Sequence, residues 1–203
     1  MYAISYGLYL VTTNVGTTLN GCITNTVVQV ATDKISVAVN KANYTCELIQ
    51  QSRKFTASII SEAASFSLFK HFGFQSGREV NKFNGYDEFS FCETGPIITE
   101  GTNAWISAEV TETLDLGSHM LFIATVKDKG MLSEVPSATY NFYQENIKPK
   151  KSTSDVPAGV TEDGKTIWRC KICGYEYVGE ELPDDFICPI CKHPKAGFEK
   201  IVR

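Results

Sequence analysis

Apolar and polar residues alternate along much of the first 143 positions. In residues 105–110, apolar Ile106, Ala108 and Val110 recur at every second position, which places them on one face of a strand. β-Branched and aromatic residues concentrate in six stretches that we predict to be strands: 4–13, 22–31, 35–40, 55–60, 104–113 and 120–127. This pattern favours a mainly β domain.

Two short helices are predicted between these strands. Asn43 is a suitable N-cap for a helix that runs to about residue 52, and a second helix is expected from Ser61 to just before Gly73. Strands and helices do not alternate regularly, which argues against a doubly wound parallel sheet. Because many short strands with few helices are typical of a barrel, we predict a β-barrel domain over residues 1–145.

The composition of the sequence changes after residue 145. Residues 146–159 are polar, contain Pro149 and Pro157, and have no large apolar face. We therefore interpret residues 146–164 as a flexible linker, with a short basic tail on a sheet as the alternative. The remaining residues, 165–203, are predicted to form a second, smaller domain.

Charge and composition exclude several classes of function. The net charge of −4 argues against non-specific binding to nucleic acid, which needs a basic surface. No apolar run approaches the roughly 20 residues that a membrane span requires. The N-terminus has neither a basic flank nor a small-residue cleavage site, so no signal peptide is predicted and the expected compartment is the cytoplasm.

Four of the seven cysteines form two C-x-x-C pairs near the C-terminus: Cys170 with Cys173, and Cys188 with Cys191. Two such turns facing each other supply four thiolates in a tetrahedron, which suits iron or zinc. The spacing alone favours structural zinc. Residues 176–185 carry five acids and no base. That run is either a solvated loop or a docking surface for a basic partner.

The residues around the cysteine pairs change the preferred metal. The segments C-G-Y at 173–175, L-P-D-D-F at 182–186 and C-P-x-C at 188–191 occur in this order. Over about 36 residues the C-terminal domain resembles rubredoxins, and the resemblance implies one iron held by four cysteines for electron transfer. Zinc is the alternative metal in a recombinant sample. The structural alternative is a zinc knuckle that merely holds the chain end together.

Four further motifs occur in order in the first domain: L-N-G-C-I-T-N-T at 19–26, V-N-K-A-N-Y-T at 39–45, F-G-F-Q-S-G-R at 72–78 and G-S-H-M at 117–120. Together they resemble the flavin reductase family over roughly residues 2–135. The resemblance implies an FMN-binding split β-barrel that is usually a homodimer. It also implies that a reduced nicotinamide, NADH or NADPH, donates hydride to the flavin.

The resemblance points to individual residues as well. A strand end running into a helix at 40–45 suits a phosphate group, although Asn and Thr at strand ends are also ordinary turn formers. His119 corresponds to a family histidine on the nicotinamide side, and Ser118 stands where an acid is common. The expected flavin contacts are Gly21, Cys22, Ile23, Thr24, Asn25, Thr26, Asn40, Lys41, Tyr44, Thr45, Ser76, Gly77, Arg78 and Lys82.

The two halves together predict an oxidoreductase. A nicotinamide gives up two electrons as hydride, an iron tetrathiolate accepts one electron at a time, and a flavin mediates between them. The architecture resembles high-molecular-weight rubredoxins, which implies transfer to a redox protein such as a flavodiiron protein that reduces oxygen or nitric oxide. Two alternatives stay open: a free-flavin reductase with a regulatory tail, and a non-enzymatic FMN-binding protein with a structural zinc domain.

Overall fold

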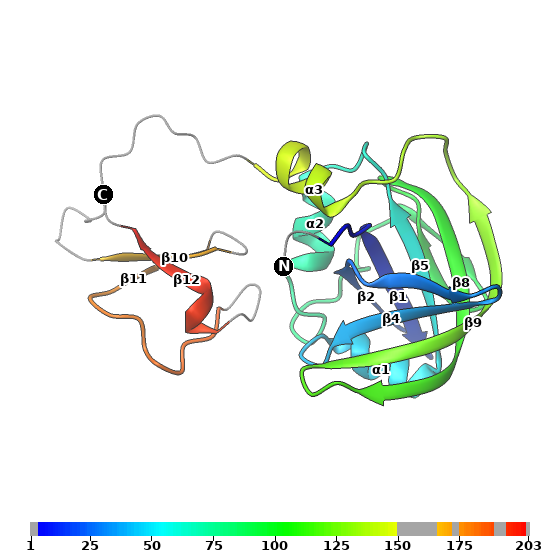
Figure 1. Ribbon diagram of the computed structural model, residues 1–203, viewed down its shortest axis with the longest axis horizontal. Coiled ribbons are helices and arrows are strands. Elements are labelled where there is room, and N and C mark those ends of the chain that lie inside the picture. The colour runs from blue at the N-terminus through cyan, green and yellow to red at the C-terminus, as the bar shows by residue number, and fades with distance from the viewer. Residues whose placement is uncertain (1–3, 150–165, 172–174, 189–193, 202–203) are drawn as a thin grey trace. The chain divides into compact units, whose positions relative to one another are not determined.

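A computed structural model describes residues 4–149, 166–171, 175–188 and 194–201. The chain divides into two compact units between Pro149 and Lys150, and we describe each unit by itself (Figure 1). Within the described ranges, no helix combines the length and the apolar character that crossing a membrane requires.

A seven-stranded antiparallel sheet forms the first unit, in the spatial order β2-β1-β5-β8-β9-β4-β3. Its strands are β1 (Tyr9–Val15), β2 (Thr18–Thr24), β3 (Val27–Ala31), β4 (Lys34–Asn40), β5 (Lys54–Ile60), β8 (Thr102–Asp115) and β9 (His119–Met131). A separate hairpin packs on β1 and β5 and consists of β6 (Phe89–Cys92) and β7 (Gly95–Ile98). The helices are α1 (Tyr44–Ser52), α2 (Phe66–Gly73), α3 (Tyr140–Phe142) and the π-helix η1 (Tyr143–Ile147).

The two terminal strands of the sheet, β2 and β3, follow one another in the chain, so the turn between them joins the two edges of the sheet. At this join the Thr26 hydroxyl donates to the Ala38 carbonyl oxygen over 2.8 Å and accepts from the Ala38 N–H over 3.3 Å. These bonds fasten the turn to β4. The mainly β barrel that the sequence predicts is therefore confirmed.

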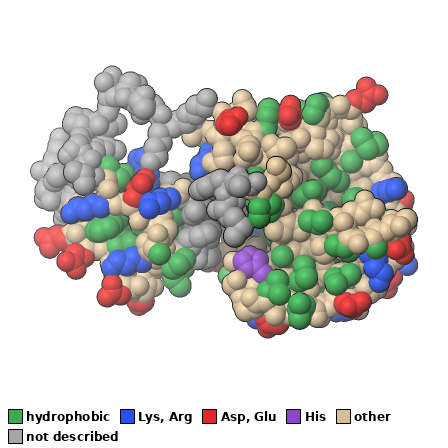
Figure 2. Space-filling view, viewed as in Figure 1, with side chains coloured by type: hydrophobic (Ala, Val, Ile, Leu, Met, Phe, Trp, Pro, Cys, Tyr) green, Lys and Arg blue, Asp and Glu red, His purple; other side chains and the backbone are tan. Residues whose placement is uncertain are grey.

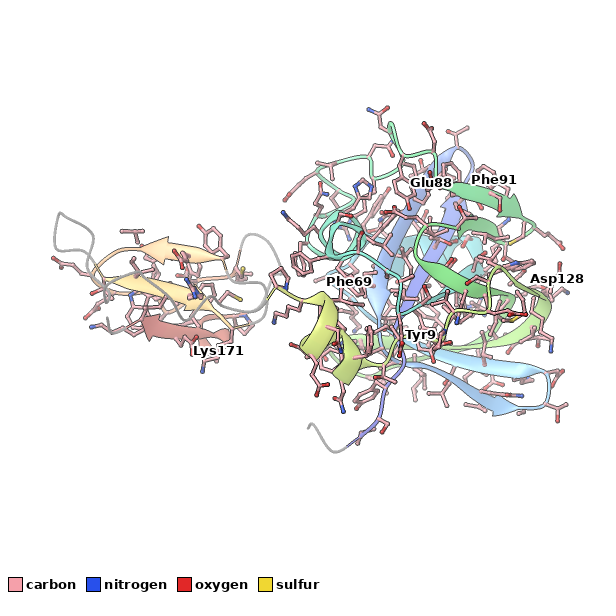
Figure 3. All side chains as sticks on the ribbon, turned by 90° about the horizontal axis from the view of Figure 1, so that it is seen from above. Tyr9, Phe69, Glu88, Phe91, Asp128 and Lys171 are labelled. Carbon is pink, nitrogen blue, oxygen red and sulfur yellow. The ribbon has the colours of Figure 1, made fainter. Side chains whose placement is uncertain are left out.

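Two apolar cores stabilise the barrel, one on each side of β1 and β2. Alternate strand residues fill the inner core, where Val37, Phe55 and Phe122 are fully buried. The outer core lies beneath α2 and the α3–η1 segment. There Phe69 of α2, labelled in Figure 3, lies with its ring centroid 4.4 Å from that of Tyr143.

Several predicted strand boundaries differ from the structure. The strand predicted at 4–13 begins only at Tyr9. The strand predicted at 22–31 is two strands, because the chain turns at Asn25 and Thr26 to bond β4. The pattern of apolar residues also misses the β6–β7 hairpin, whose strands are only four residues long.

The helix after Asn43 forms as predicted, but the helix expected from Ser61 begins at Phe66. Ser61 instead belongs to the edge of the sheet, since its N–H and its hydroxyl donate to the Gly101 carbonyl oxygen over 2.9 and 3.1 Å. At the other end of the unit, η1 includes residues 146 and 147, the first two of the predicted linker. Residues 150–164 of that linker lie outside the described residues.

The second unit is a three-stranded antiparallel sheet in the order β11-β10-β12. Its elements are β10 (Ile167–Cys170), β11 (Glu176–Val178), the 3-10 helix η2 (Lys195–Gly197) and β12 (Phe198–Ile201). Among the described residues, its buried cluster consists of Cys170, Leu182, Cys188 and Phe198. Two of these four are cysteines, so much of this interior is sulfur rather than hydrocarbon.

Candidate functional site

Two predicted contact residues lie at the end of β4, beside the turn between β8 and β9. Asn40 pairs with His119 across β4 and β9, and the Lys41 N–H donates to the Ser118 carbonyl oxygen over 3.0 Å. His119 Nδ1 lies 2.9 Å from the Ser118 hydroxyl, a contact that orients the ring. The structure therefore brings the predicted nicotinamide-side histidine next to the predicted phosphate cluster.

The Lys41 ammonium group reaches across the same turn. It pairs with the Asp115 carboxylate over 2.5 Å. This bond, with a second one from the Gly117 N–H, lowers the pKa of the Asp115 carboxyl group. Ser118 stands where the family commonly has an acid, and the structure supplies an acid three residues earlier in the same turn.

Helix α1 joins the two predicted groups of donors. Arg78, from the loop after α2, pairs with Glu47 of α1 over 2.8 Å. The Arg78 guanidinium carbon also lies 4.9 Å from the centroid of the Tyr44 ring, where the ring electrons attract a cation. The loop at 76–82 and the segment at 40–45, distant in sequence, therefore form one surface at the start of α1.

Three buried polar atoms near this surface have no hydrogen-bond partner in the described structure: both amide atoms of Asn20 and the hydroxyl of Thr45. Asn20 is 2% exposed and Thr45 is 1% exposed. Buried polar groups are nearly always paired, because an unpaired one costs about 1–3 kcal/mol. A polar ligand would supply the missing partners. Sequence reasoning missed Asn20, although it directly precedes Gly21 in the first motif.

Gly77 packs directly on Asn20. A Cβ atom at residue 77 would lie 2.3 Å from Asn20 Nδ2, so any larger residue would displace the amide. Two positions further along β2, the Cys22 thiol is buried beside Thr45. Burial raises the pKa of this thiol, against the opposing charge of the nearby Lys82 ammonium. Cys22 is therefore a neutral part of the wall rather than a thiolate nucleophile.

Other predicted contacts along β2 already make interactions within the barrel. The hydroxyls of Thr24 and Thr26 lie 2.9 Å apart, and both donate to the Ala38 carbonyl oxygen. Gly21 leaves no room for a side chain, because a Cβ there would lie 2.9 Å from a methyl group of β1. Ile23 packs against the outer core. These residues shape the wall on which the buried polar atoms of Asn20 and Thr45 lie.

Two further predicted residues lie in turns. Asn25 is half-buried at the turn between β2 and β3. The Ser76 hydroxyl accepts a hydrogen bond from the Arg78 N–H over 3.3 Å, and the Ser76 carbonyl oxygen accepts one from the Val80 N–H over 3.1 Å. Ser76 thus holds the loop that carries Arg78.

Lys82 differs from the other predicted donors because its side chain points into the fold. It is 4% exposed, and its ammonium donates to the carbonyl oxygens of Gly21 over 2.8 Å and Phe72 over 2.7 Å. Burial lowers the pKa of Lys82 to about 8. Through its hydrogen bond to Gly21, the ammonium group helps to fix the position of β2.

The second unit holds two of the four predicted metal ligands at the bases of two turns. The Cys170 N–H donates to the Tyr175 carbonyl oxygen over 2.8 Å, which closes the first turn, and a bridge between Ile187 and Pro194 closes the second. Cys170 and Cys188 are 1% and 0% exposed and belong to one cluster. Two buried sulfurs in one cluster fit the soft donor set of iron or zinc.

The other two predicted ligands, Cys173 and Cys191, lie outside the described residues. The described residues contain no group of three metal-ligating side chains. Aromatic rings surround the two described sulfurs, and Phe186 is central among them, with ring centroids 4.9 Å from Tyr177 and 5.3 Å from Phe198. Such a shell excludes water and so influences the potential of a bound metal.

The acidic run at 176–185 is partly neutralised in the structure. Glu176 pairs with Arg169, and Asp184 pairs with Lys195 over 2.7 Å. The bond from Lys195 lowers the pKa of the Asp184 carboxyl group. Figure 2 likewise shows acidic and basic side chains interspersed on the visible face of this unit. The acidic surface is therefore smaller than the sequence indicates.

A cleft of about 550 Å³ opens in the barrel between the start of β1, the β3–β4 hairpin and β9. Its lining includes Tyr9, Asp33 and Lys129. None of the sequence-predicted contacts is among its lining residues. The predicted contacts thus belong to the wall around α1 and β2 rather than to this cleft.

Known proteins resemble both units. The family described as "Flavin reductase like domain" matches residues 1–151, and the family described as "Rubrerythrin, rubredoxin-like domain" matches residues 168–199. Over 226 aligned residues the chain is 34% identical to the high molecular weight rubredoxin of Moorella thermoacetica, covering 99% of this chain and 98% of that protein. The chain belongs to the high molecular weight rubredoxin family.

Two further proteins match the flavin reductase domain of this chain. A ferric-chelate reductase (NAD(P)H) of Archaeoglobus fulgidus is 34% identical and covers 73% of this chain and 89% of that protein. An FMN-binding protein from Thermus thermophilus, solved with bound p-hydroxybenzaldehyde, shares the fold with a TM-score of 0.57 and 26% identity, over 64% and 73% of the two chains. The protein is therefore an oxidoreductase whose two domains imply flavin and iron.

Proposed function

We propose that the protein passes electrons from NADH or NADPH through FMN to an Fe(Cys)4 centre, and then to an acceptor such as a flavodiiron protein. One observation carries the proposal: a single chain combines unsatisfied buried polar atoms in a flavin reductase barrel with buried cysteines in a rubredoxin-like module. When bound, the flavin accepts a hydride and releases single electrons, so it links a two-electron donor to a one-electron metal.

Features of the barrel support FMN as the flavin. A helix N-terminus and a nearby ammonium attract an anion. The start of α1, with Lys41 and Tyr44 close to it, therefore suits the phosphate group of FMN. The relative from Thermus thermophilus is an FMN-binding protein by name, and the relative from Archaeoglobus fulgidus is an NAD(P)H enzyme by name.

Each residue has a role in the proposed pathway. Asn20 and Thr45 hydrogen-bond the flavin with the buried polar atoms that have no partner among the described residues. His119, oriented by Ser118, contacts the nicotinamide so that it faces the flavin. Four thiolates hold the iron, and their filled coordination shell excludes direct hydride transfer to the metal. The iron ligands are Cys170, Cys173, Cys188 and Cys191.

Domain arrangement and assembly are part of the same proposal. The segment from the end of η1 to residue 164 is a linker that lets the module at 165–203 approach the flavin and then the acceptor. The barrel at 1–145 forms a homodimer in the cytoplasm, and the second copy covers the flavin wall. Exposed Glu180, Glu181 and Asp185 orient a basic acceptor.

A stopped-flow experiment tests the order of transfer. Protein stripped of flavin is mixed with NADH and then with NADPH while the ferric thiolate band is followed. The iron of the stripped protein is expected to stay oxidised, and added FMN is expected to restore its bleaching. Thr45→Val tests the proposed site, with Thr111→Val on the exposed face of β8 as a control. Rapid bleaching without flavin would refute the proposed pathway.

The relative from Archaeoglobus favours one second candidate, a reductase whose flavin or ferric chelate is the final acceptor. A Cys188→Ala variant separates the two functions. If the iron centre lies on the pathway, the variant keeps NADH oxidation with free flavin but loses reduction of the acceptor protein. If the module is only a regulatory tail, both rates persist.

A further inference from the structure

Lys82 is the most unusual charged residue of the barrel. It lies between α2 and β6 and is 4% exposed. Its ammonium makes hydrogen bonds to two carbonyl oxygens, that of Gly21 on β2 and that of Phe72 on α2. Within residues 4–149, the structure pairs this ammonium with no carboxylate.

The backbone around Lys82 is fixed from both sides. His71 Nε2 of α2 lies 2.5 Å from the Lys82 carbonyl oxygen, and the next N–H, that of Phe83, donates to the Asn81 side chain over 3.0 Å. The His71 ring stacks on Tyr86, with centroids 5.1 Å apart. The Lys82 backbone is therefore fixed in position. Its two hydrogen bonds to carbonyl oxygens keep the ammonium buried as well.

A buried ammonium without an anion is an expensive way to bind two carbonyl groups. A neutral amide donor such as glutamine makes the same kind of bond without carrying a charge out of water. The carbonyl that Lys82 binds belongs to Gly21, which lies between Asn20 and Cys22 on the wall with the unsatisfied polar atoms. The fixed positive charge therefore lies directly behind the proposed flavin site.

We propose that Lys82 is a positioning residue that also makes flavin reduction more favourable, because its buried charge stabilises the reduced flavin more than the oxidised flavin. This inference rests on the proposed function. Hydride transfer adds two electrons and one proton to the flavin and leaves NAD(P)⁺. The reduced ring therefore gains one negative charge unless it takes up a further proton. A nearby cation in a low-dielectric interior stabilises that charge.

The two roles of Lys82 have different consequences. Through its bond to Gly21 it holds β2 in place, and loss of that bond weakens binding of oxidised and reduced flavin equally. Through its charge it favours reduced flavin only. The ratio of the two dissociation constants, and hence the midpoint potential of the bound flavin, reports the charge alone.

The test uses the full-length protein with FMN. The dissociation constant of oxidised FMN is measured by fluorescence, and the midpoint potential of the bound flavin by spectroelectrochemistry. Lys82→Met removes both the charge and the donor, and Lys82→Gln removes only the charge. Both are expected to lower the preference for reduced flavin by about tenfold, which for a two-electron couple is about 30 mV.

A matched control is Lys54→Met. The Lys54 ammonium also donates to a backbone carbonyl, that of Glu93 over 2.9 Å, but at an exposed site outside the proposed wall. This variant is expected to keep the wild-type potential. A potential that Lys82→Gln leaves unchanged, or an equal shift in Lys54→Met, would overturn the inference while leaving the proposed function intact. A wild-type protein that binds no flavin in either oxidation state would overturn both.

A measurement on the wild-type protein covers the case in which both variants fail to fold. Of the neighbouring titratable groups, the Cys22 thiol of β2 interacts electrostatically with the ammonium, whereas His71 of α2 contacts the Lys82 carbonyl oxygen and stacks on Tyr86. Burial raises the pKa of Cys22 and of Tyr86. Burial lowers that of Lys82 to about 8. Above pH 8 Lys82 loses its proton when the flavin is oxidised and regains it when the flavin is reduced. Reduction then takes up one more proton per electron pair, so the midpoint potential is expected to fall more steeply with pH. An unchanged slope would overturn the inference.

Discussion

The barrel and the rubredoxin-like module of this protein keep their folds by different means. The barrel has fifteen buried residues in its inner core alone, drawn from α1 and all seven strands of the large sheet. The described part of the module has four, and two of them are cysteines. Small domains with little apolar core need a metal or another cross-link. The barrel is therefore expected to fold without its cofactor, and the module is not.

The largest effect is expected from Cys188→Ala. Loss of one thiolate removes most of a metal-binding free energy on the order of 10 kcal/mol, and folding of the module with it. Iron per chain and resistance of the module to protease should both collapse, while thermal unfolding of the barrel stays unchanged. Cys92→Ala, in the β6–β7 hairpin, is the control and should keep its iron. A Cys188→Ala variant with a full tetrahedral iron site would show that the ligand assignment is wrong.

The converse change is Phe122→Ala in the inner core of the barrel. The Phe122 side chain is fully buried, and truncation is expected to lower the free energy of unfolding by about 3–5 kcal/mol. Denaturant titration of the barrel measures this, and the iron content should remain at the wild-type level. Leu114→Ala, at a position 56% exposed, should change stability little. Loss of iron from Phe122→Ala would break the comparison, because it would show that the units fold together.

The pH dependence of barrel stability tests the effect of one buried charge, that of the Lys82 ammonium, which destabilises the folded barrel. Lys82 has a folded-state pKa of about 8 against an ordinary value of 10.5. Between these values the unfolded chain binds more protons, so the free energy of unfolding rises with pH. Relative to Lys82→Met, wild-type stability should gain about 3 kcal/mol from pH 8 to pH 10.5.

The comparison with Lys82→Met is needed because other groups titrate in the same range. Burial raises the pKa of the Cys46 thiol to about 11, which lowers barrel stability above pH 9 in both proteins. Subtracting the two unfolding curves removes this common contribution. A pH-independent difference between the proteins would mean that Lys82 has the same pKa in the folded and the unfolded chain, so that burial does not lower it.

The smallest effect is expected from Arg169→Gln in the module. Arg169 pairs with Glu176 on the surface, and exposed ion pairs contribute less than about 1 kcal/mol. Iron content and thermal stability of the module should therefore stay close to wild type, also at high salt. A large loss of stability would show that surface charge, and not the metal, holds the module together.

The metal site is the part that the sequence predicts in most detail. Each C-x-x-C turn is local, so the spacing alone brings two sulfurs together, and the surrounding residues distinguish iron from zinc. Period-two alternation likewise predicts most of the long strands, because a strand with one buried face repeats every two residues. Short or turn-rich segments such as β6, β7 and the join between β2 and β3 are missed, since four residues carry too little pattern.

The flavin wall depends on contacts between residues far apart in the sequence. Lys82 looks like a solvent-facing donor in the sequence, yet it is buried because the carbonyl oxygen it binds lies 61 residues away on β2. Arg78 meets Glu47 across 31 residues, and the unsatisfied amide of Asn20 is recognisable only once Gly77 lies on it. Residue types and local spacing thus determined which chemistry this chain carries. Only long-range packing decided which side chains face a ligand, because burial and hydrogen-bond satisfaction are properties of the assembled barrel.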